Sequence, residues 1–447
     1  MTMQGETIAA IATPPGEGAL AVIRISGERA LAVADTVFRA AKPLSAIEER
    51  RVVFGKIVDS TGGVLDEVLL TVFRNPRSYT GEDLVEISGH GGPVVASRVL
   101  AAVLATGARM ARPGEFTERA FQNGKLDLTQ AEAVMDLINA QTDRAAKAAA
   151  GQLEGRLGSE IHTLRARLLE TVAHLEAFID FPEEGIDPES GEVLRKRMES
   201  VRGHLDGLLA TANEGRLLRE GITLALCGAP NAGKSSLLNR LLGMDRAIVS
   251  ETAGTTRDTI EERASLGGYP FRVIDTAGLR ETEDPVEREG VERARRAAEA
   301  SDLRILLVDA VEKAAPSSLF ADELLVLNKV DLIANRDALP AGIQISCRSG
   351  EGIEKLVQAI LAKATGRSSA LGETAPDVTA INTRHRDYLL KARGHLDAAI
   401  ALLESGEPPE LVAVELRSAL GDVGEIVGEA GTEEILGKIF SSFCIGK

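Results

Sequence analysis

The segment GITLALCGAPNAGKSS at residues 221–236 constrains the fold of this chain more than any other. An apolar run typical of a buried strand is followed directly by the pattern G-x-x-x-x-G-K-S at residues 228–235. Backbone amides of such a loop wrap a phosphate chain, while Lys234 would reach the β- and γ-phosphates and the Ser235 hydroxyl would bind Mg²⁺. Strand, glycine-rich loop and helix in this order predict a nucleotide-binding α/β domain.

Two further motifs are placed to act on the phosphates and the metal. DTAG follows another apolar run, so Asp275 would hold the Mg²⁺ shell through water and the Gly278 amide would meet the γ-phosphate. TAGTTRD lies between this motif and the phosphate loop, and either Thr255 or Thr256 can close over the metal. The order of these motifs along the chain is that of GTPases.

A second pair of motifs is suited to guanine. NKVD ends an apolar run, and the Asp331 carboxylate can accept both N–H groups of the guanine N1/N2 edge, a pattern that adenine lacks. SCRSGEG, which begins at Ser346, supplies a backbone donor for guanine O6. Together, the motifs in this order predict a GTP site.

One position departs from Ras-like GTPases. There, the residue after D-T-A-G is a glutamine that orients the attacking water, whereas here it is Leu279, which cannot do so. Either hydrolysis is slow, or the water and the charge are handled by other groups. The side-chain carbonyl of Asn231 in the phosphate loop can ligate a monovalent cation beside the phosphates, in the space that an arginine finger would fill.

The rest of the chain shows two other sequence patterns. Residues 1–121 are expected to form an α+β domain of short strands with one helix at 93–108. Its expected strands lie at 19–27, 51–58, 68–75 and 84–89. Residues 122–217 are helical, because apolar residues recur every three or four positions from Leu153 to Ile179 and again from Val193 to Leu208.

Strands and helices then alternate in residues 218–372, and helices return in residues 373–447. The later expected strands lie at 271–278, 303–310, 324–331 and 342–346. The later expected helices lie at 387–405, 410–428 and 432–440. This order predicts a Ras-like α/β G domain inserted into a discontinuous helical bundle, since an insertion is tolerated where its two ends lie close together.

The composition agrees with this prediction and limits the partners. There is no Trp and aromatic residues make up only 3%, so the cores must be aliphatic, which favours helices and parallel sheet. The net charge of −16 argues against nucleic-acid binding over the whole surface, although a local basic patch stays possible. The three scattered cysteines form no disulfide or zinc pattern. No secretion signal or long apolar run is present, so a cytoplasmic protein without a membrane segment is expected.

Motifs over the whole length resemble those of one family. GAPNAGKSSLLN, TAGTTRD and DTAGLR are shared by many GTPases. More specific are TPPGEGALAVIRISG, TGEDLVEISGHGGP, RPGEFTERAF, KLDLTQAEAV and the terminal IFSSFCIGK. In this order they resemble the MnmE (TrmE) family of tRNA-modification GTPases. The resemblance implies a folate-binding N-terminal domain that dimerises, a discontinuous helical domain, and an inserted G domain that is activated when two G domains pair in the presence of K⁺.

The resemblance also implies a reaction and partners. A homodimer of such a chain would form a heterotetramer with the flavoprotein MnmG and bind GTP and tRNA. Together they would add an aminomethyl-type (carboxymethylaminomethyl) group at C5 of the wobble uridine of certain tRNAs. The one-carbon donor would be 5-formyl-tetrahydrofolate or a related tetrahydrofolate, and FAD is expected on MnmG and not on this chain.

By the same resemblance, Glu287 is the catalytic residue that positions water in place of the missing glutamine. The implied K⁺ ligands are Asn231, Ser250, Thr252 (through its carbonyl) and Thr255, and the implied Mg²⁺ ligands are Ser235 and Thr256. Motifs and resemblance together predict these GTP-binding residues: Gly228, Asn231, Ala232, Gly233, Lys234, Ser235, Ser236, Ser250, Glu251, Thr252, Ala253, Gly254, Thr255, Thr256, Asp275, Thr276, Ala277, Gly278, Asn328, Lys329, Asp331, Ser346, Cys347 and Arg348.

The resemblance implies a folate site as well, made by Arg24, Glu86, Lys125 and Lys447. A carboxylate such as Glu86 can accept two N–H bonds from the aminopyrimidine edge of a pterin, and basic side chains can meet the carboxylates of the glutamyl tail. Without the resemblance, Arg24 and Glu86 would be interpreted as ordinary charges on strands.

Cys444 lies fourth from the C-terminus, which is the position of a prenylated cysteine. Gly446 is not aliphatic, Lys447 is not a usual final residue, and no second anchoring signal lies upstream, so a lipid anchor is not expected. Two interpretations stay open, namely a catalytic thiol near the one-carbon group and a buried structural thiol. Lys447 is expected to fold back onto the N-terminal domain of a dimer partner.

Two other functions fit parts of the sequence. A regulatory GTPase switch that scaffolds partners would carry the nucleotide motifs but would need neither the folate residues nor the terminal motif. A structural helical protein with an inactive phosphate loop is not favoured, because Lys234, Asp275 and Asp331 are all present.

Overall fold

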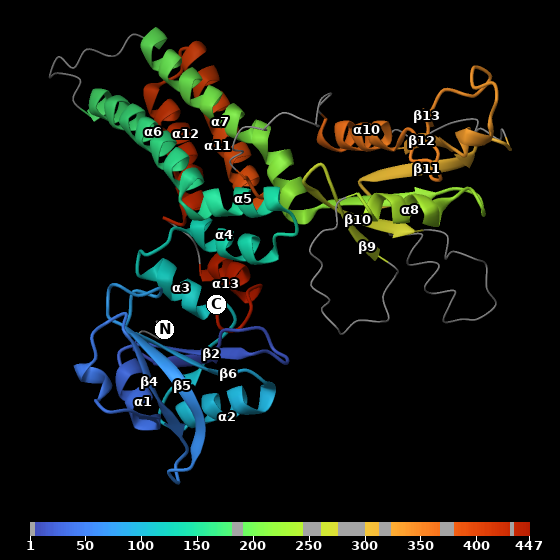
Figure 1. Cartoon of the computed structure of the whole chain (residues 1–447). Helices are drawn as coiled ribbons and strands as arrows, with labels where there is room; N and C mark the ends of the chain where they lie inside the picture. The colour runs from blue at the N-terminus through green and yellow to red at the C-terminus, as the bar shows by residue number, and fades with distance from the viewer. Residues whose placement is uncertain are drawn as a thin grey trace, which may run out of the picture. The chain divides into compact units, whose positions relative to one another are not determined.

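The computed structural model describes residues 5–180, 191–244, 261–275, 300–312, 323–366, 380–429 and 433–447 (Figure 1). These residues form two compact units. The N-terminal unit comprises Met1–Met135 and Gly424–Lys447, and the central unit comprises Asp136–Val423. The chain passes from one unit to the other within α4 (Leu128–Asn139) and again within α12 (Pro409–Val427).

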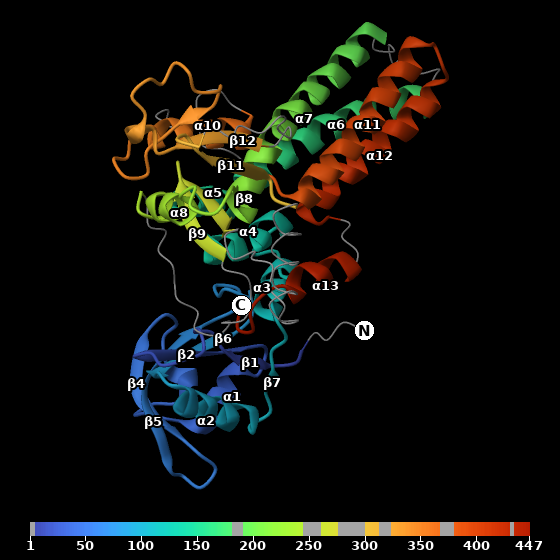
Figure 2. The same ribbon diagram turned by 90° about the vertical axis from the view of Figure 1, so that its right-hand side faces the viewer.

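A seven-stranded sheet forms the centre of the N-terminal unit (Figure 2). Its order is β3-β4-β5-β6-β2-β1-β7, and every pair is antiparallel except the parallel pair β1–β7. The strands are β1 (Ile8–Ile11), β2 (Leu20–Ser26), β3 (Phe38–Arg39), β4 (Val52–Val58), β5 (Val64–Phe73), β6 (Leu84–His90) and β7 (Arg109–Met110). Buried and open residues alternate along much of β5, because successive side chains of a strand point to opposite faces.

Two helices, α1 (Ala30–Val37) and α2 (Pro93–Leu104), pack against the buried side chains of this sheet. Val33 of α1 and Val99 and Val103 of α2 share one core with the inward-facing strand residues. The start of α2 follows from its sequence, since the fixed φ of Pro93 suits the first turn of a helix.

The C-terminal segment packs against residues 115–131 in a smaller part of the same unit. α3 (Glu115–Gln122) and the start of α4 lie beside α13 (Glu433–Ser441), which leads to the C-terminus (Figures 1 and 2). Leu128 and Ala131 of α4 pack there with Phe440 and Phe443 in a core of their own.

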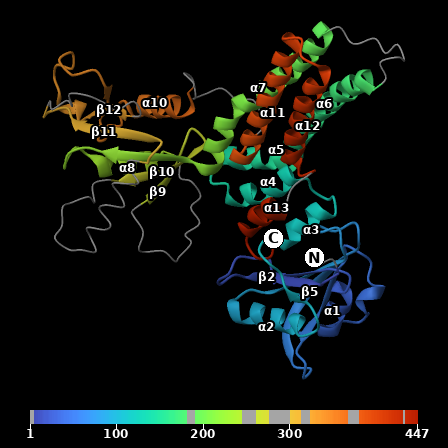
Figure 3. The same ribbon diagram turned by 180° about the vertical axis from the view of Figure 1, so that it is seen from behind.

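A helical bundle makes up one part of the central unit, and in it α6, α7, α11 and α12 run side by side (Figure 3). Its helices are α5 (Asp143–Leu153), α6 (Arg156–Asp180), α7 (Gly191–Glu220), α11 (Thr383–Glu404) and α12. Leu157, Ile161, Leu164 and Leu168 of α6 are all buried, so the predicted apolar stripe faces the bundle interior.

A six-stranded sheet makes up the other part of the central unit, with the order β13-β12-β11-β8-β10-β9. All its pairs are parallel except β9–β10. The strands are β8 (Ile222–Cys227), β9 (Glu261–Leu266), β10 (Tyr269–Asp275), β11 (Leu303–Asp309), β12 (Glu323–Asn328) and β13 (Ile343–Gln344). Helices α8 (Lys234–Leu242) and α10 (Ile353–Thr365) share one core with this sheet, and Ala145 of α5 and Leu217 of α7 join that core.

The structure confirms the predicted fold class and adds elements that the sequence pattern did not predict. The N-terminal region has more than the single expected helix, because α1 and α3 also form there. Each has eight residues, which is too short for a clear helical period. The strands β1, β3, β7 and β9 were also not predicted, and three of them have four residues or fewer. The predicted domain boundaries after residues 121, 217 and 372 stay predictions.

Candidate functional site

Two glycines shape the ends of the phosphate loop, which runs from β8 to α8. Gly228 has a φ of 144°, and a Cβ there would lie 2.2 Å from the carbonyl oxygen of Leu307. Gly233 has a φ of 101°, and a Cβ there would lie 2.3 Å from the side-chain nitrogen of Asn328. Both positions therefore require glycine, which gives the physical reason for the two glycines of the motif.

Lys234 is the first residue of α8 and is only 6% exposed. Its Nζ donates to the carbonyl oxygens of Gly228 at 2.7 Å and Ala229 at 3.0 Å, so the ammonium lies inside the loop. Asn231, with a left-handed φ of 64°, and Ser235 are both exposed. The ammonium group and the N-terminus of α8 together form a site of positive potential that suits a phosphate chain.

Asn328 joins the phosphate loop to the guanine loop, a name we give to residues 346–348. It is 2% exposed, its Nδ2 donates to the carbonyl of Ala232 at 2.8 Å, and its Oδ1 accepts from the Cys347 amide at 3.1 Å. Burial raises the pKa of the Cys347 thiol, although Arg240 and Asn328 act in the opposite direction. The guanine loop also carries two polar side chains, those of Ser346 and Arg348, and the Ser346 hydroxyl accepts from the Ser349 amide at 3.2 Å.

The other two polar residues of the NKVD motif, Lys329 and Asp331, have separate surroundings. Lys329, with a φ of 66°, places its Nζ 2.6 Å from the Oδ2 of Asp309. Burial raises the pKa of Asp309, but the bonds from Lys329 and the Val311 amide outweigh it and hold that pKa below its ordinary value. Asp331 is exposed in a short 3-10 turn after β12, where its carboxylate can accept bonds from a ligand.

Several predicted residues lie outside the described part of the chain. β10 ends at Asp275, whose backbone is in register with Leu226, directly before the end of β8. This register places Asp275 beside the strand that leads into the phosphate loop. Outside the described residues lie Ser250, Glu251, Thr252, Ala253, Gly254, Thr255, Thr256, Thr276, Ala277, Gly278, Leu279 and Glu287.

The N-terminal unit brings Arg24 and Glu86 together. They are register partners on β2 and β6, and the Arg24 Nε lies 2.7 Å from the Glu86 Oε1. The guanidinium of Arg24 also lies 5.4 Å from the ring centroid of Tyr79, a cation–π distance. Burial raises the pKa of Tyr79, whose hydroxyl is hydrogen-bonded to that of Thr117 at 2.9 Å. Arg24 and Glu86 keep 20% and 26% of their side chains exposed, so both can still contact a ligand.

The C-terminal tail lies against the N-terminal unit of its own chain, which corrects the expectation that Lys447 reaches that of a dimer partner. Ile445 forms an antiparallel bridge with Pro113, and the Phe116 amide donates to the Lys447 carbonyl oxygen at 3.2 Å. Gly446 has a φ of 96°, and a Cβ there would lie 2.3 Å from a backbone oxygen of β1. The tail is therefore tightly fitted at its last residues.

The charges of Arg24 and Glu86 act on the side chain of Lys447. Burial and the charge of Arg24 lower the pKa of Lys447, while Cys444 and Glu86 act against them, and the pKa lies below its ordinary value. The thiol of Cys444 is exposed, so its interpretation as a buried structural thiol is wrong, while its catalytic role stays a prediction. The Lys125 side chain contacts a different group, since its Nζ donates to the carbonyl oxygen of Pro76 at 3.0 Å.

A buried ion-pair network beneath the tail was not predicted from the sequence. Glu115, the first residue of α3, is 2% exposed and accepts bonds from Arg109 at 2.6 and 2.8 Å and from Arg119 at 3.0 Å. Burial raises the pKa of Glu115, but these contacts and the Arg112 amide outweigh it and lower the pKa to about 2. The signal was present in RPGEFTERAF, but paired charges at these spacings do not reveal that the glutamate is buried.

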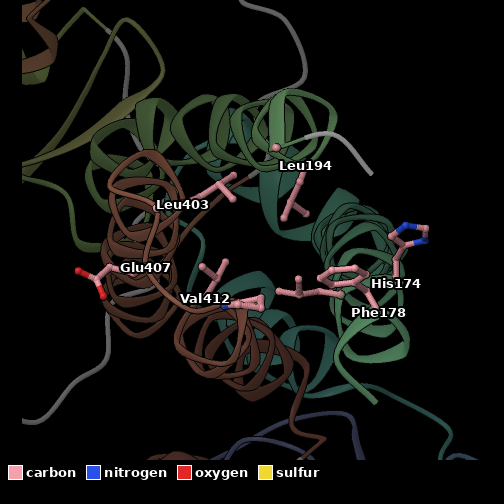
Figure 4. A pocket seen from close by; sticks show the side chains of 10 residues that line it. His174, Phe178, Leu194, Leu403, Glu407 and Val412 are labelled. Carbon is pink, nitrogen blue, oxygen red and sulfur yellow. The ribbon is translucent and has the colours of Figure 1, made fainter. Parts of the chain in front are cut away.

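The helical bundle contains a cavity of about 240 Å³ (Figure 4). Phe178, Leu194 and Val412 point toward its interior, whereas Glu407 points away. The cavity therefore presents mainly apolar surface and belongs to neither of the two sites described above.

In the part of the chain that the structure describes, no group of three or more His, Cys, Asp or Glu side chains could hold a metal ion. Within the same residues, no helix combines the length and the hydropathy that a membrane span requires.

Comparisons with known proteins identify the family of this chain. Residues 7–125 match a family model described as the GTP-binding protein TrmE N-terminus, and residues 128–444 match one described as the MnmE helical domain. The tRNA modification GTPase MnmE of Akkermansia muciniphila is 48% identical over 453 residues, with 100% of both chains covered. Those of Moorella thermoacetica and Geobacillus thermodenitrificans are 46% and 45% identical, with 100% and 99% of both chains covered.

A solved structure of an Aquifex aeolicus Era variant bound to GDP·AlF4⁻ is 26% identical. The match covers 39% of this chain and 66% of the Era chain, and its TM-score of 0.25 is too low to support a conclusion. The matches to the two family models and to relatives over the full length show the family. This chain belongs to the MnmE family of tRNA modification GTPases.

Proposed function

We propose that this chain hydrolyses GTP and, with the flavoprotein MnmG, adds an aminomethyl-type (carboxymethylaminomethyl) group at C5 of the wobble uridine of certain tRNAs. One observation carries the proposal: a complete phosphate loop with Lys234 inside it and a terminal lysine beside the Arg24–Glu86 pair occur in one chain. A protein that only switches between nucleotide states needs the first site and not the second.

Mass analysis of wobble nucleosides tests this proposal. Cells that lack the protein should lose the modified uridine, the wild-type chain should restore it, and Lys234→Ala should not. Unchanged nucleosides in the deletion strain would instead support a regulatory switch that scaffolds partners.

In GTP hydrolysis, the chain's own residues bind and orient the nucleotide. Lys234 is held by carbonyl oxygens and would neutralise charge on the β- and γ-phosphates. The exposed Ser235 hydroxyl, with Thr256, would hold Mg²⁺, which supplies charge stabilisation on the phosphates when bound. Glu287 would orient the attacking water, because Leu279 cannot. Glu287→Ala should therefore slow hydrolysis and spare GTP binding.

The proposed role of K⁺ rests on Asn231. This residue is exposed at a left-handed turn of the phosphate loop, so its side-chain carbonyl is available to a cation beside the phosphates. Ser250, Thr252 and Thr255 would complete the ligand set. GTP hydrolysis should therefore be faster in KCl than in an equal concentration of NaCl, and equal rates would contradict the K⁺ site.

The proposed folate site is centred on Arg24 and Glu86. Glu86 offers a carboxylate for the aminopyrimidine edge of 5-formyl-tetrahydrofolate or a related tetrahydrofolate, while Arg24 and Lys447 offer positive charge for its carboxylates. Lys125 would take part only if it exchanged its bond to the Pro76 carbonyl for one to the ligand. Cys444 is exposed near Lys447 and is the candidate for chemistry at the one-carbon group.

The proposed homodimer has a suitable surface on the N-terminal unit. Phe54 of β4 and Leu69 of β5 are register partners and are 62% and 48% exposed, and Val52 on the same strand is 62% exposed. Apolar side chains at this exposure favour a protein partner. The net charge of −16 suggests that MnmG supplies much of the basic surface for tRNA in the proposed heterotetramer, where FAD would also reside on MnmG. We expect the complex in the cytoplasm.

A further inference from the structure

A second connection between the phosphate loop and the guanine loop runs through Arg240. This residue lies on α8, the helix that begins at Lys234, and none of the nucleotide motifs named above includes it. Its Nε donates to the carbonyl oxygen of Cys347 at 3.3 Å, and its Nη2 donates to that of Arg348 at 2.9 Å. One guanidinium therefore holds two successive carbonyl groups of the guanine loop.

These contacts fix the direction of backbone amides. In a trans peptide, the C=O and the following N–H point to opposite sides. Holding the Cys347 carbonyl toward Arg240 thus turns the Arg348 amide away from α8. The next peptide behaves in this way, since the Arg348 carbonyl faces Arg240 while the Ser349 amide donates to the Ser346 hydroxyl at 3.2 Å.

Asn328 and Arg240 hold the guanine loop by different groups. Asn328 accepts from the Cys347 amide, whereas Arg240 donates to the carbonyls of Cys347 and Arg348. Since Asn328 also binds the Ala232 carbonyl and Arg240 lies on α8, both link the guanine loop to the phosphate-binding segment. A nucleotide that fills both halves of the site must match the spacing that these two residues set.

We propose that Arg240 is a positioning residue for guanine, which holds the guanine loop so that a backbone N–H of the loop faces the O6 of the base. This inference rests on the proposed GTP site and adds a determinant of its base specificity. The role needs the planar fork of arginine, because a lysine ammonium is a point charge that reaches two carbonyls less well.

The test uses the full-length chain and two ligands, GDP and the diphosphate of 2-aminopurine riboside, which keeps the 2-amino group and lacks O6. In Arg240→Met, which keeps an apolar stem and removes the donors, we expect GDP to bind about tenfold more weakly, mainly through faster dissociation. The 2-aminopurine nucleotide should lose less than about twofold, because it has no O6 to lose. Arg240→Lys should restore part of the GDP affinity.

Arg272→Met is the matched control, since Arg272 is exposed on β10 and donates to the Thr223 hydroxyl at 3.3 Å. It should change neither affinity. The unliganded Arg240→Met chain should keep the wild-type unfolding midpoint. Equal losses for the two ligands, or no loss for GDP, would overturn the role of Arg240. Failure of the wild-type chain to bind GDP would instead contradict the proposed function.

Discussion

The phosphate loop and the tail site, by which we mean Arg24, Glu86 and Lys447, are assembled in opposite ways. Residues 228–235 follow one another between a strand and a helix, and Lys234 bonds to carbonyls of the same loop. Lys447 instead lies beside Arg24 and Glu86, which are separated from it by most of the chain. The first site depends on local residue identity, whereas the second depends on the folding of the whole N-terminal unit. Changes that damage one should therefore leave the other working.

The largest expected effect is that of Lys234→Ala on the phosphate loop. Removing the ammonium that we propose to contact the phosphates should lower kcat/KM for GTP by about a hundredfold or more. Lys363→Ala is the control, because Lys363 is exposed on α10 and donates to the Glu323 carbonyl at 2.8 Å, outside the nucleotide motifs. If Lys234→Ala kept GTP turnover within twofold of wild type while Lys363→Ala did the same, this loop would not be the hydrolytic site.

Glu115→Gln should give the next largest effect, on the N-terminal unit alone. The folded pKa of about 2 lies below the ordinary 4.5, so the charged form stabilises the fold above about pH 4.5 and loses this contribution as the pH falls toward 2. This pKa difference corresponds to about 3 kcal/mol of folding free energy at neutral pH. Urea unfolding from pH 7 to pH 2.5 should show a flatter profile in the variant. A variant profile as steep as the wild-type one would contradict the assignment.

Gly446→Ala should detach the tail without changing a charge. The left-handed φ and the close backbone oxygen leave no room for a Cβ, so the free energy of unfolding of the N-terminal unit should fall by about 2 kcal/mol. Gly437→Ala on α13 is the matched control, because a Cβ there meets nothing within 4 Å. It should stabilise the helix by up to about 1 kcal/mol. Similar results for both alanines would show that the tail is not tightly fitted.

Lys447→Ala should give the smallest of these effects and the most specific one. It keeps the backbone bond to Phe116 but removes the charge beside Arg24 and Glu86. Binding of 5-formyl-tetrahydrofolate, measured by calorimetry, should weaken about tenfold, or about 1.4 kcal/mol. GTP turnover should stay within twofold. Lys438→Ala, on the exposed side of α13, should change neither value. An equal loss of folate binding in this variant would show that the effect comes from net positive charge and not from the position of Lys447.

The same contrast explains what the sequence could predict. The phosphate loop was predicted residue by residue, because its residues are consecutive and the positive φ of Gly228 and Gly233 is a local property of the backbone. Arg240 was not predicted, since its partners Cys347 and Arg348 follow β13, far away in the sequence, and no local pattern indicates the contact. The folate residues, Lys447 among them, were predicted only through family resemblance, and the contact of the tail with its own chain depends on the packing of α3 against α13.

Both sites are proposed to serve one reaction on tRNA, although the chain builds them separately. The most direct measurement is the amount of modified wobble uridine in cells whose only copy of the chain is wild type, Lys234→Ala or Lys447→Ala, each at equal protein level. We predict that Lys234→Ala abolishes the modification and that Lys447→Ala lowers it strongly at limiting folate while keeping GTP hydrolysis in the purified protein. Full modification in the Lys447→Ala strain under limiting folate would contradict the claim.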